Sequence, residues 1–278
     1  MARILDGKAA ASVIKENMKY YIQDRNLKLI IFQAGDNPAS NVYIRNKQRA
    51  CEEVGIESIT IKVSDPDDLK AHILSNVDNC DAMMLQLPLP EDYGDEQYYI
   101  DLIPPEKDAD CLTSKRLGEL FLGSAEFAPC TAQGIMDLLD INDIEVEGKH
   151  VVIVGRSNIV GKPVAHLMLE ANATVTVCHS RTKNLEEFTR SADILVVAIG
   201  KPKFITADMV KEGAVVVDVG INRMEDGKLC GDVDFDDVLD KVSAITPVPG
   251  GCGAMTVAEL LANTVSCTEA IYNNTKLI

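Results

Sequence analysis

The chain has 278 residues, of which 46% are hydrophobic, and it carries a formal net charge of −16. This length allows one large domain or two modest ones. The negative charge argues against broad binding to nucleic acid or anionic membranes, because both need a positive surface. No apolar run approaches the roughly 20 residues of a membrane span and the N-terminal sequence lacks a signal-peptide pattern, so we expect a cytoplasmic protein without membrane partners.

The eight cysteines form no CxxC pair, and the chain is far longer than a scaffold stapled by disulfides. We therefore expect reduced, mostly structural thiols. The spacing of cysteines and histidines does not support a zinc site, so no metal is expected.

The first half alternates predicted strands and helices. Helical spacing of apolar residues predicts a helix over 7–24, and LKLIIFQAG predicts a strand buried on both faces. A second helix is predicted over 37–55, because Asn37 can cap its start, a proline follows, and Gly55 suits its end. Strand SITIKV, helix DPDDLKAHILSNV and strand DAMMLQLPLP come next, before the loop IPPEKDADCL.

Lys47 lies in the middle of an apolar stripe of the 37–55 helix, between Tyr43 and Ala50. A lysine there either extends its ammonium group to solvent, which is the commoner case, or points into a cleft as a reagent. Gln86 ends its strand at the edge where open parallel sheets bind ligands, which allows it to face the same cleft. A glutamine at this position is more often an ordinary strand-end residue, and Asp108 and Asp110 are more often solvated loop acids.

The second half repeats the alternation after a predicted helix from Thr131 to Leu139. VEGKHVVIVGRSNIVGKPVAHLMLEANATVTVCHS predicts strand, glycine turn, helix and strand. ADILVVAIG, GAVVVDVG and SAITPVPGG predict three more strands, and Met255 to about Tyr272 a final helix. This pattern is typical of a doubly wound nucleotide-binding sheet.

The turn Gly155–Gly161, GRSNIVG, leaves a strand and opens a helix whose N-terminus would face a pyrophosphate. It is not GxGxxG, so a structural turn is the alternative. The next strand ends in His179, Ser180 and Arg181 instead of the acid that holds the ribose of NAD. Together with Arg156, these residues suit a 2′-phosphate and favour NADP, unless the arginines are ordinary surface charges.

The chain resembles the bifunctional methylenetetrahydrofolate dehydrogenase/methenyltetrahydrofolate cyclohydrolase family in PASNVYIRNKQRACEEVGI, LQLPLP, PPEKDADC, PCTAQG, VGRSNIVGKP, TVTVCHSRT, ADILVVAIGKP, GAVVVDVGINR, GDV and TPVPGG. The resemblance runs nearly end to end. It implies two α/β domains with a cleft between them. Residues 1–122 would form a folate-binding catalytic domain on which a C-terminal helix, 254–278, packs back. Residues 123–253 would form a Rossmann-like, doubly wound NADP-binding domain, and the protein would be a homodimer.

The resemblance also assigns roles. Lys47 corresponds to the catalytic lysine, Gln86 to its hydrogen-bond partner, Tyr43 to the residue that stacks on folate, and Asp110 to the pterin-binding aspartate. Pro249 and Gly250 border the substrate. The cofactor residues that it implies are Gly155, Arg156, Ser157, Gly161, Ser180, Arg181 and Ile221.

The implied reactions belong to one-carbon metabolism and purine biosynthesis. 5,10-Methylenetetrahydrofolate is oxidised with NADP to the 5,10-methenyl cation, which is then hydrolysed to 10-formyltetrahydrofolate. Burial of Lys47 and contact with a cation both disfavour its ammonium form, which leaves a neutral amine as a base.

The sequence departs from the family at Cys111, where glycine is usual, and at Ala132, where PCTA stands in place of PCTP. It also departs at Cys252 and Ala254, where GCGAMT stands in place of GVGPMT. These changes bear on the folate pocket. They leave open three rivals: an NADP dehydrogenase that releases the methenyl product, a silent folate- or nucleotide-binding protein, and an unrelated two-domain dehydrogenase of the shikimate type.

Overall fold

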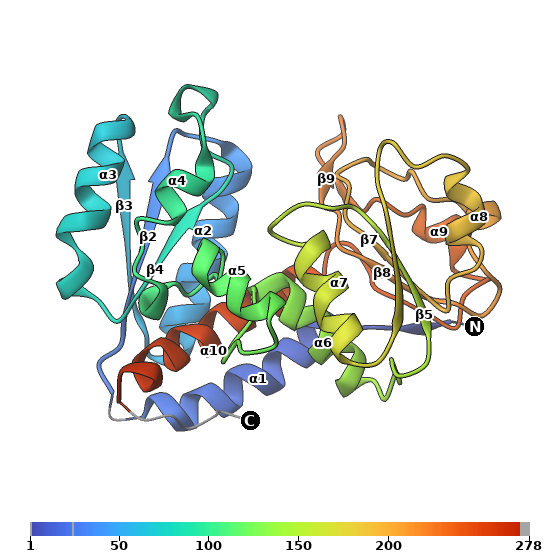
Figure 1. The fold of residues 1–278 in the computed structure, drawn as a ribbon, viewed down its shortest axis with the longest axis horizontal. Helices are drawn as coiled ribbons and strands as arrows, with labels where there is room; N and C mark the ends of the chain where they lie inside the picture. Colours follow the sequence, from blue (N-terminus) through green and yellow to red (C-terminus); the bar gives the residue numbers. More distant parts are fainter. Residues whose placement is uncertain (1, 24, 273–278) are drawn as a thin grey trace. The chain divides into compact units, whose positions relative to one another are not determined.

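The computed structural model describes residues 2–23 and 25–272, with side chains described as far as residue 268. The chain divides into two compact units (Figure 1). The Lys47 unit contains the described residues of Ser12–Cys130 and Val257–Ile278, and the Gly155 unit contains those of Met1–Ala11 and Thr131–Thr256. The division falls within α1 (Gly7–Ile22), after the first residue of α6 (Cys130–Ile141), and within α10 (Cys252–Tyr272).

The Lys47 unit is built on a parallel three-stranded sheet in the order β3-β2-β4. Its strands are β2 (Lys28–Ala34), β3 (Glu57–Val63) and β4 (Ala82–Gln86). Helix α2 (Pro38–Val54) joins the first two strands and α3 (Pro66–Ser75) joins the last two, as the sequence predicts. Two short helices, α4 (Glu96–Ile100) and α5 (Ser114–Phe121), have no counterpart among the predicted elements.

Alternation along the strands gives this sheet two apolar faces. Leu29, Ile31, Ala82 and Met84 pack on one face with residues of α1, α2 and α10, among them Leu260, Leu261 and Val265. Ile30, Phe32, Met83 and Leu85 pack on the other face with residues of α3 and α4. Because both faces are covered, β2 and β4 read as continuous apolar runs, as expected for a buried parallel sheet.

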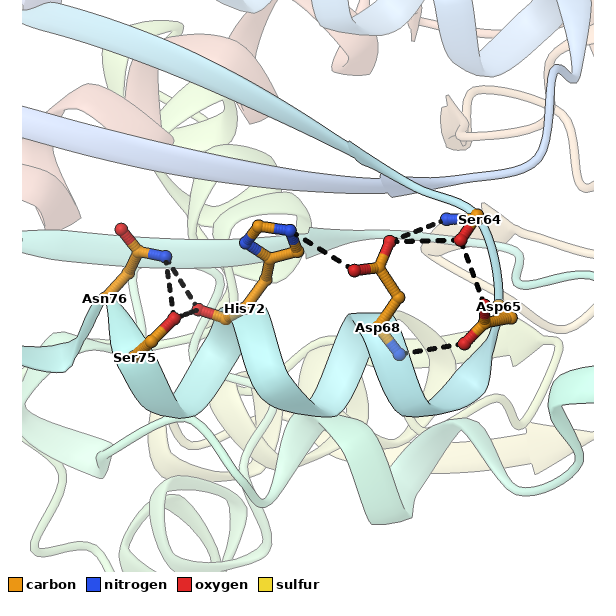
Figure 2. Close-up of polar contacts among 6 residues, drawn as sticks. All are labelled: Ser64, Asp65, Asp68, His72, Ser75 and Asn76. Atoms are coloured by element: carbon orange, nitrogen blue, oxygen red, sulfur yellow. Dashed lines mark hydrogen bonds and ion pairs between the residues drawn. The ribbon is translucent and has the colours of Figure 1, made fainter.

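Local hydrogen bonds fix both ends of α3 (Figure 2). Asp65 caps the start by accepting from the backbone N–H of Asp68 at 2.9 Å, and Asp68 Oδ2 accepts from the backbone N–H of Ser64 at 2.9 Å. One turn on, His72 Nε2 lies 3.3 Å from Asp68 Oδ1, and Asn76 Nδ2 donates to the His72 carbonyl at 2.8 Å. These contacts account locally for the predicted DPDDLKAHILSNV helix, which the structure has over Pro66–Ser75.

The Gly155 unit contains a parallel six-stranded sheet in the order β1-β11-β8-β7-β5-β6. Its strands are β1 (Arg3–Ile4), β5 (His150–Val154), β6 (Thr174–Cys178), β7 (Ile194–Val197), β8 (Val215–Asp218) and β11 (Ala244–Ile245). The helices are α6 (Cys130–Ile141), α7 (Gly161–Glu170), α8 (Leu185–Thr189) and α9 (Phe235–Val238). A small antiparallel pair, β9 (Asn222–Arg223) and β10 (Leu229–Cys230), has no counterpart among the predicted strands. The strand order reverses at β5, as in a Rossmann-like fold.

The N-terminal strand lies outside the expected boundaries. The expected first domain spans residues 1–122, but Arg3 pairs with Ala244 and Ile4 with Ile245 at the edge of the other sheet. Two residues are too short for a periodic signal, and the pairing partner lies more than two hundred residues away in the chain. At the other end α10 is described as far as Tyr272, and residues 273–278 of the predicted 254–278 helix lie outside the described residues.

All eight cysteines are free, and seven of them are buried, as expected of structural thiols. Among the residues that the structure describes, no helix combines the length and the apolar character that crossing a membrane requires.

Candidate functional site

Helix α2 presents Lys47 to the interior of its unit. Asn37 caps the helix by accepting from the backbone N–H groups of Ala39 (2.9 Å) and Ser40 (3.4 Å), and Gly55 ends it at a φ of +91°. These are the boundaries that the sequence predicts. The buried residues of the helix are Ser40, Ile44, Lys47, Ala50, Cys51 and Val54. Lys47 is 6% exposed, so the alternative of an ammonium group extended to solvent is excluded.

The amine of Lys47 meets two uncharged groups from β4. Nζ donates to Gln86 Oε1 at 3.1 Å and contacts Met84 Sδ at 3.4 Å. Met84 and Gln86 are two residues apart and therefore project from the same face of the strand. The amide nitrogen of Gln86 donates to the Leu87 carbonyl at 2.8 Å, which leaves its oxygen as the group that faces the lysine. The structure thus brings Lys47 and Gln86 together and fixes the direction of their hydrogen bond.

Tyr43 precedes Lys47 by about one turn of α2 and is partly buried. Burial raises the pKa of its phenol above the ordinary value, so the ring stays neutral near neutral pH. This placement is compatible with the predicted stacking role of Tyr43 beside Lys47.

Asp110 follows a segment that is tied to β4. Met83 pairs with Asp108, and the Ala109 N–H donates to the Met83 carbonyl at 3.1 Å. Asp108 itself is buried and accepts from the Thr113 N–H at 2.7 Å; burial raises the pKa of its carboxyl group to about 6. Asp110 is only partly buried. Of the two loop acids, Asp108 is therefore structural, whereas Asp110 remains accessible to a ligand.

Cys130 is a buried thiol next to the segment that leads to Asp110. Burial raises the pKa of Cys130, the charge of Asp110 raises it further, and the charge of Lys47 lowers it. Cys130 Sγ also contacts the carbonyl of Ala109, the residue before Asp110, at 3.2 Å. Cys130 therefore packs directly against the peptide that precedes Asp110.

Asn263 of α10 is a residue of this neighbourhood that the sequence does not predict. Its side chain is buried, and Nδ2 donates to the carbonyls of Ala109 and Ala128, each at 3.0 Å. The peptide before Asp110 is thus held from both sides, by β4 and by α10. The contact spans more than a hundred and fifty residues of sequence, and no local pattern indicates it.

Cys111 stands where the resemblance to the family leads us to expect glycine. Its φ is +59°, in the left-handed region that glycine adopts without cost. The side chain is buried, and Sγ lies 3.4 Å from the Phe127 carbonyl. The backbone turn is therefore retained despite the substitution.

The other departures lie at helix starts. Ala132 is the third residue of α6, and Cys252 and Ala254 are the first and third residues of α10. Proline suits the first turn of a helix because N–H groups there lack intrahelical acceptors. The N–H that alanine supplies at 254 donates to the Gly251 carbonyl at 3.1 Å, so the helix start is preserved.

The predicted cofactor turn lies between β5 and α7 in the Gly155 unit. Gly155 has a φ of +135°, and a side chain at Gly161 would collide with the Gly155 carbonyl. Ser157 Oγ accepts from the backbone N–H groups of Val160 (3.2 Å) and Gly161 (3.4 Å). Only glycine permits this tight entry into a helix, whose N-terminus carries the partial positive charge that an anion needs.

The remaining predicted residues of this unit lie on loops. Arg156, Ser180 and Arg181 are all exposed. Ser180 and Arg181 lie just beyond β6, where the Arg181 N–H donates to His179 Nδ1 at 3.1 Å. Ile221, Pro249 and Gly250 also belong to this unit, and Lys8 N donates to the Gly250 carbonyl at 3.1 Å. Tyr43, Lys47, Gln86 and Asp110 all belong to the Lys47 unit.

Both units match models of known protein domains. Residues 5–110 match the catalytic domain of tetrahydrofolate dehydrogenase/cyclohydrolase, and residues 129–272 match its NAD(P)-binding domain. The chain is 48% identical over 282 aligned positions to the bifunctional protein FolD of Agathobacter rectalis, covering 98% of this chain and 99% of that protein.

Solved structures agree with these matches. The bifunctional FolD of Campylobacter jejuni is 44% identical and superposes with a TM-score of 0.92, covering 98% of this chain and 100% of that one. A Trypanosoma brucei FolD complexed with NADP cofactor and an inhibitor is 33% identical, with a TM-score of 0.92 and coverage of 98% and 99%. A shikimate dehydrogenase from Thermus thermophilus is only 17% identical, with a TM-score of 0.53, and shares the fold alone.

Proposed function

This chain belongs to the tetrahydrofolate dehydrogenase/cyclohydrolase family, and from that premise we propose that it performs two reactions in succession. It oxidises 5,10-methylenetetrahydrofolate to 5,10-methenyltetrahydrofolate with NADP, and it hydrolyses the methenyl cation to 10-formyltetrahydrofolate. The observation that carries the second reaction is the buried hydrogen bond from Lys47 Nζ to Gln86 Oε1, 3.1 Å long.

Lys47 is the base of the hydrolysis. Apart from its bond to Cε, an amine nitrogen has three tetrahedral directions, and two of them are directed at Gln86 and Met84. The third carries the lone pair when the amine is neutral. The lone pair takes a proton from the water that adds to the methenyl carbon, the bond from that carbon to N5 then breaks, and one proton is released overall.

Gln86 orients this base. Because its amide nitrogen donates to the Leu87 carbonyl, its oxygen cannot rotate away from Lys47 without loss of that hydrogen bond. In the proposed complex Tyr43 stacks on the folate ring and Asp110 accepts hydrogen bonds from the aminopyrimidine edge of the pterin. Pro249 and Gly250 border the substrate.

The residues of the glycine turn fit a dinucleotide. Gly155, Ser157 and Gly161 bring the chain to the N-terminus of α7, where a pyrophosphate is stabilised by the helix dipole. Arg156, Ser180 and Arg181 are donors suited to a 2′-phosphate, which favours NADP over NAD. Bound NADP supplies the hydride acceptor, and Ile221 packs against it in this proposal.

We also propose that the enzyme is a cytoplasmic homodimer that binds neither nucleic acid nor membranes. Eight unpaired thiols suit a reducing compartment, and the net charge of −16 opposes binding to polyanions. Light scattering of the purified chain measures the oligomeric state directly.

One assay tests the proposed function. Purified protein is supplied with 5,10-methylenetetrahydrofolate and with NADP or NAD in turn, while the methenyl chromophore and the reduced nicotinamide are followed together. We expect rapid formation of reduced cofactor with NADP and only transient methenyl accumulation. Stable accumulation of the methenyl product would identify a dehydrogenase without cyclohydrolase activity, and binding without turnover would identify a silent binding protein.

A further inference from the structure

Asp232 carries a carboxylate that is completely buried in the loop between β10 and α9. Its Oδ2 accepts from the backbone N–H groups of Ile199 (2.7 Å) and Gly200 (3.0 Å). Its Oδ1 accepts from the backbone N–H of Lys201 (2.8 Å) and from Asn222 Nδ2 (2.9 Å). Four donors from two separate segments therefore converge on one side chain.

Three of these donors are consecutive backbone N–H groups that follow β7. Successive N–H groups that converge on one point form an anion-binding concavity. Here the carboxylate of the chain itself occupies that concavity, so it is not available to a phosphate. Three of its four hydrogen bonds instead hold the backbone of residues 199–201 in place.

The loop after β8 is joined to the same carboxylate. Asp218, the last residue of β8, accepts through Oδ1 from the N–H groups of Gly220 (3.0 Å) and Asp232 (2.9 Å), and through Oδ2 from the N–H of Val233 (2.9 Å). A side chain at Gly220 would collide with the Asp232 carboxyl group, so only glycine permits this approach. Asp218 and Asp232 thereby hold Gly220, which precedes Ile221.

Both loops lie where a doubly wound sheet binds its ligand. Strands β6 and β7 lie on opposite sides of β5, so the direction in which strands are added to the sheet reverses between β5 and β7. In doubly wound sheets, ligands bind beyond the carboxyl ends of the strands at such a reversal. The Gly155 turn packs directly against the end of β7, because a side chain at Gly155 would collide with the Ala198 carbonyl. Ala198 immediately precedes the segment that Asp232 holds.

We propose that Asp232 is a positioning residue for the nicotinamide cofactor. Its carboxylate holds the loops after β7 and β8 in the arrangement that receives the dinucleotide beside the Gly155 turn. This inference rests on the proposed function, because it assigns the cofactor to that turn. Asp232 touches neither cofactor nor substrate in this role.

The test compares Asp232→Asn with wild type in two reactions of the same enzyme. In either orientation of the amide, two of the four donors face an NH2 group and lose their acceptor. We expect the dissociation constant for NADPH, measured by fluorescence titration, and the KM for NADP to rise about tenfold or more. Hydrolysis of methenyltetrahydrofolate, which consumes no nicotinamide cofactor, should remain within about twofold of wild type on this mechanism.

Asp234→Asn is the matched control. Asp234 lies two residues away and pairs with Lys203 at 3.1 Å on the outside of the unit, so its loss should change neither reaction. If Asp232→Asn fails to fold, Asn222→Ala removes one of the four donors and should still raise the KM for NADP selectively.

The outcomes separate the inference from the proposed function. Unchanged NADPH binding in a folded Asp232→Asn protein, or an equal loss of both activities, overturns the positioning role. Absence of both reactions in the wild-type enzyme overturns the proposed function instead.

Discussion

Gln86 is an acceptor toward Lys47, because its amide nitrogen is engaged with the Leu87 carbonyl and its oxygen lies 3.1 Å from the amine. This hydrogen bond fixes the direction of the Lys47 amine among mostly apolar neighbours. Substitution of the donor, Lys47, and of the acceptor, Gln86, should therefore affect the cyclohydrolase reaction differently.

Lys47→Met should remove the cyclohydrolase reaction while the fold is retained. Methionine fills the same buried space beside Met84, whereas loss of a general base costs about 10²–10⁴-fold in rate. Decay of the methenyl chromophore measures the rate, and urea unfolding checks the fold. Arg49→Met, at an exposed position of the same helix, is the control and should hydrolyse normally. Full cyclohydrolase activity in Lys47→Met would exclude the lysine as the base.

Gln86→Glu should shift the acid limb of the cyclohydrolase pH profile to higher pH. A carboxylate at about the same distance favours the ammonium form of Lys47, so the neutral base appears only at higher pH. The rate at neutral pH falls and recovers in more alkaline buffer. Gln86→Met, which removes the acceptor without adding charge, should lower the rate without an alkaline recovery. Identical profiles for wild type and Gln86→Glu would contradict the assignment.

Cys111→Gly should be more stable than Cys111→Ala, by about 0.5–1 kcal/mol, because only glycine relieves the cost of a left-handed backbone. Cys51, which is fully buried in the regular part of α2, provides the matched site. There the order should reverse, with alanine favoured by about 1 kcal/mol. Free energies of unfolding in urea test the pair of substitutions at both positions. The same order at both sites would show that backbone conformation does not decide the effect at 111.

Asp218→Asn should flatten the dependence of stability on pH. Burial raises the pKa of the Asp218 carboxyl from 3.8 to about 7, with the nearby charge of Asp232 adding to the effect and backbone N–H groups opposing it. The folded state therefore binds this proton more tightly than the unfolded state. The resulting contribution to the free energy of unfolding is fully present below the ordinary pKa of 3.8. It is lost as the pH rises toward about 7.

Urea unfolding at several pH values between these limits measures the slope. Wild type should lose stability relative to Asp218→Asn as the pH rises, although Asp108, whose pKa is raised to about 6, leaves a residual slope of the same sign in both proteins. Asp78→Asn, at an exposed position, should keep the wild-type slope. Parallel curves for wild type and Asp218→Asn would mean that this carboxyl does not titrate in the window.

Much of the fold follows from local sequence. Asn37, Pro38 and Gly55 define α2 because capping depends on the residues at the helix ends themselves. The buried parallel strands are recognisable as apolar runs, because both of their faces are covered. The short helix α5 escapes prediction because it has only eight residues and contains Gly118, a poor helix former.

The sequence by itself determined that Lys47 lies on an apolar stripe and that a glycine turn follows a strand. Only the tertiary structure decided that the amine points inward to Gln86, that Asn263 holds the peptide before Asp110, that β1 joins the far sheet, and that Asp232 fills the concavity after β7. The physical reason is separation along the chain. Capping and periodicity act over a few residues, whereas each of these contacts joins segments more than thirty residues apart, and their formation depends on how the whole unit packs.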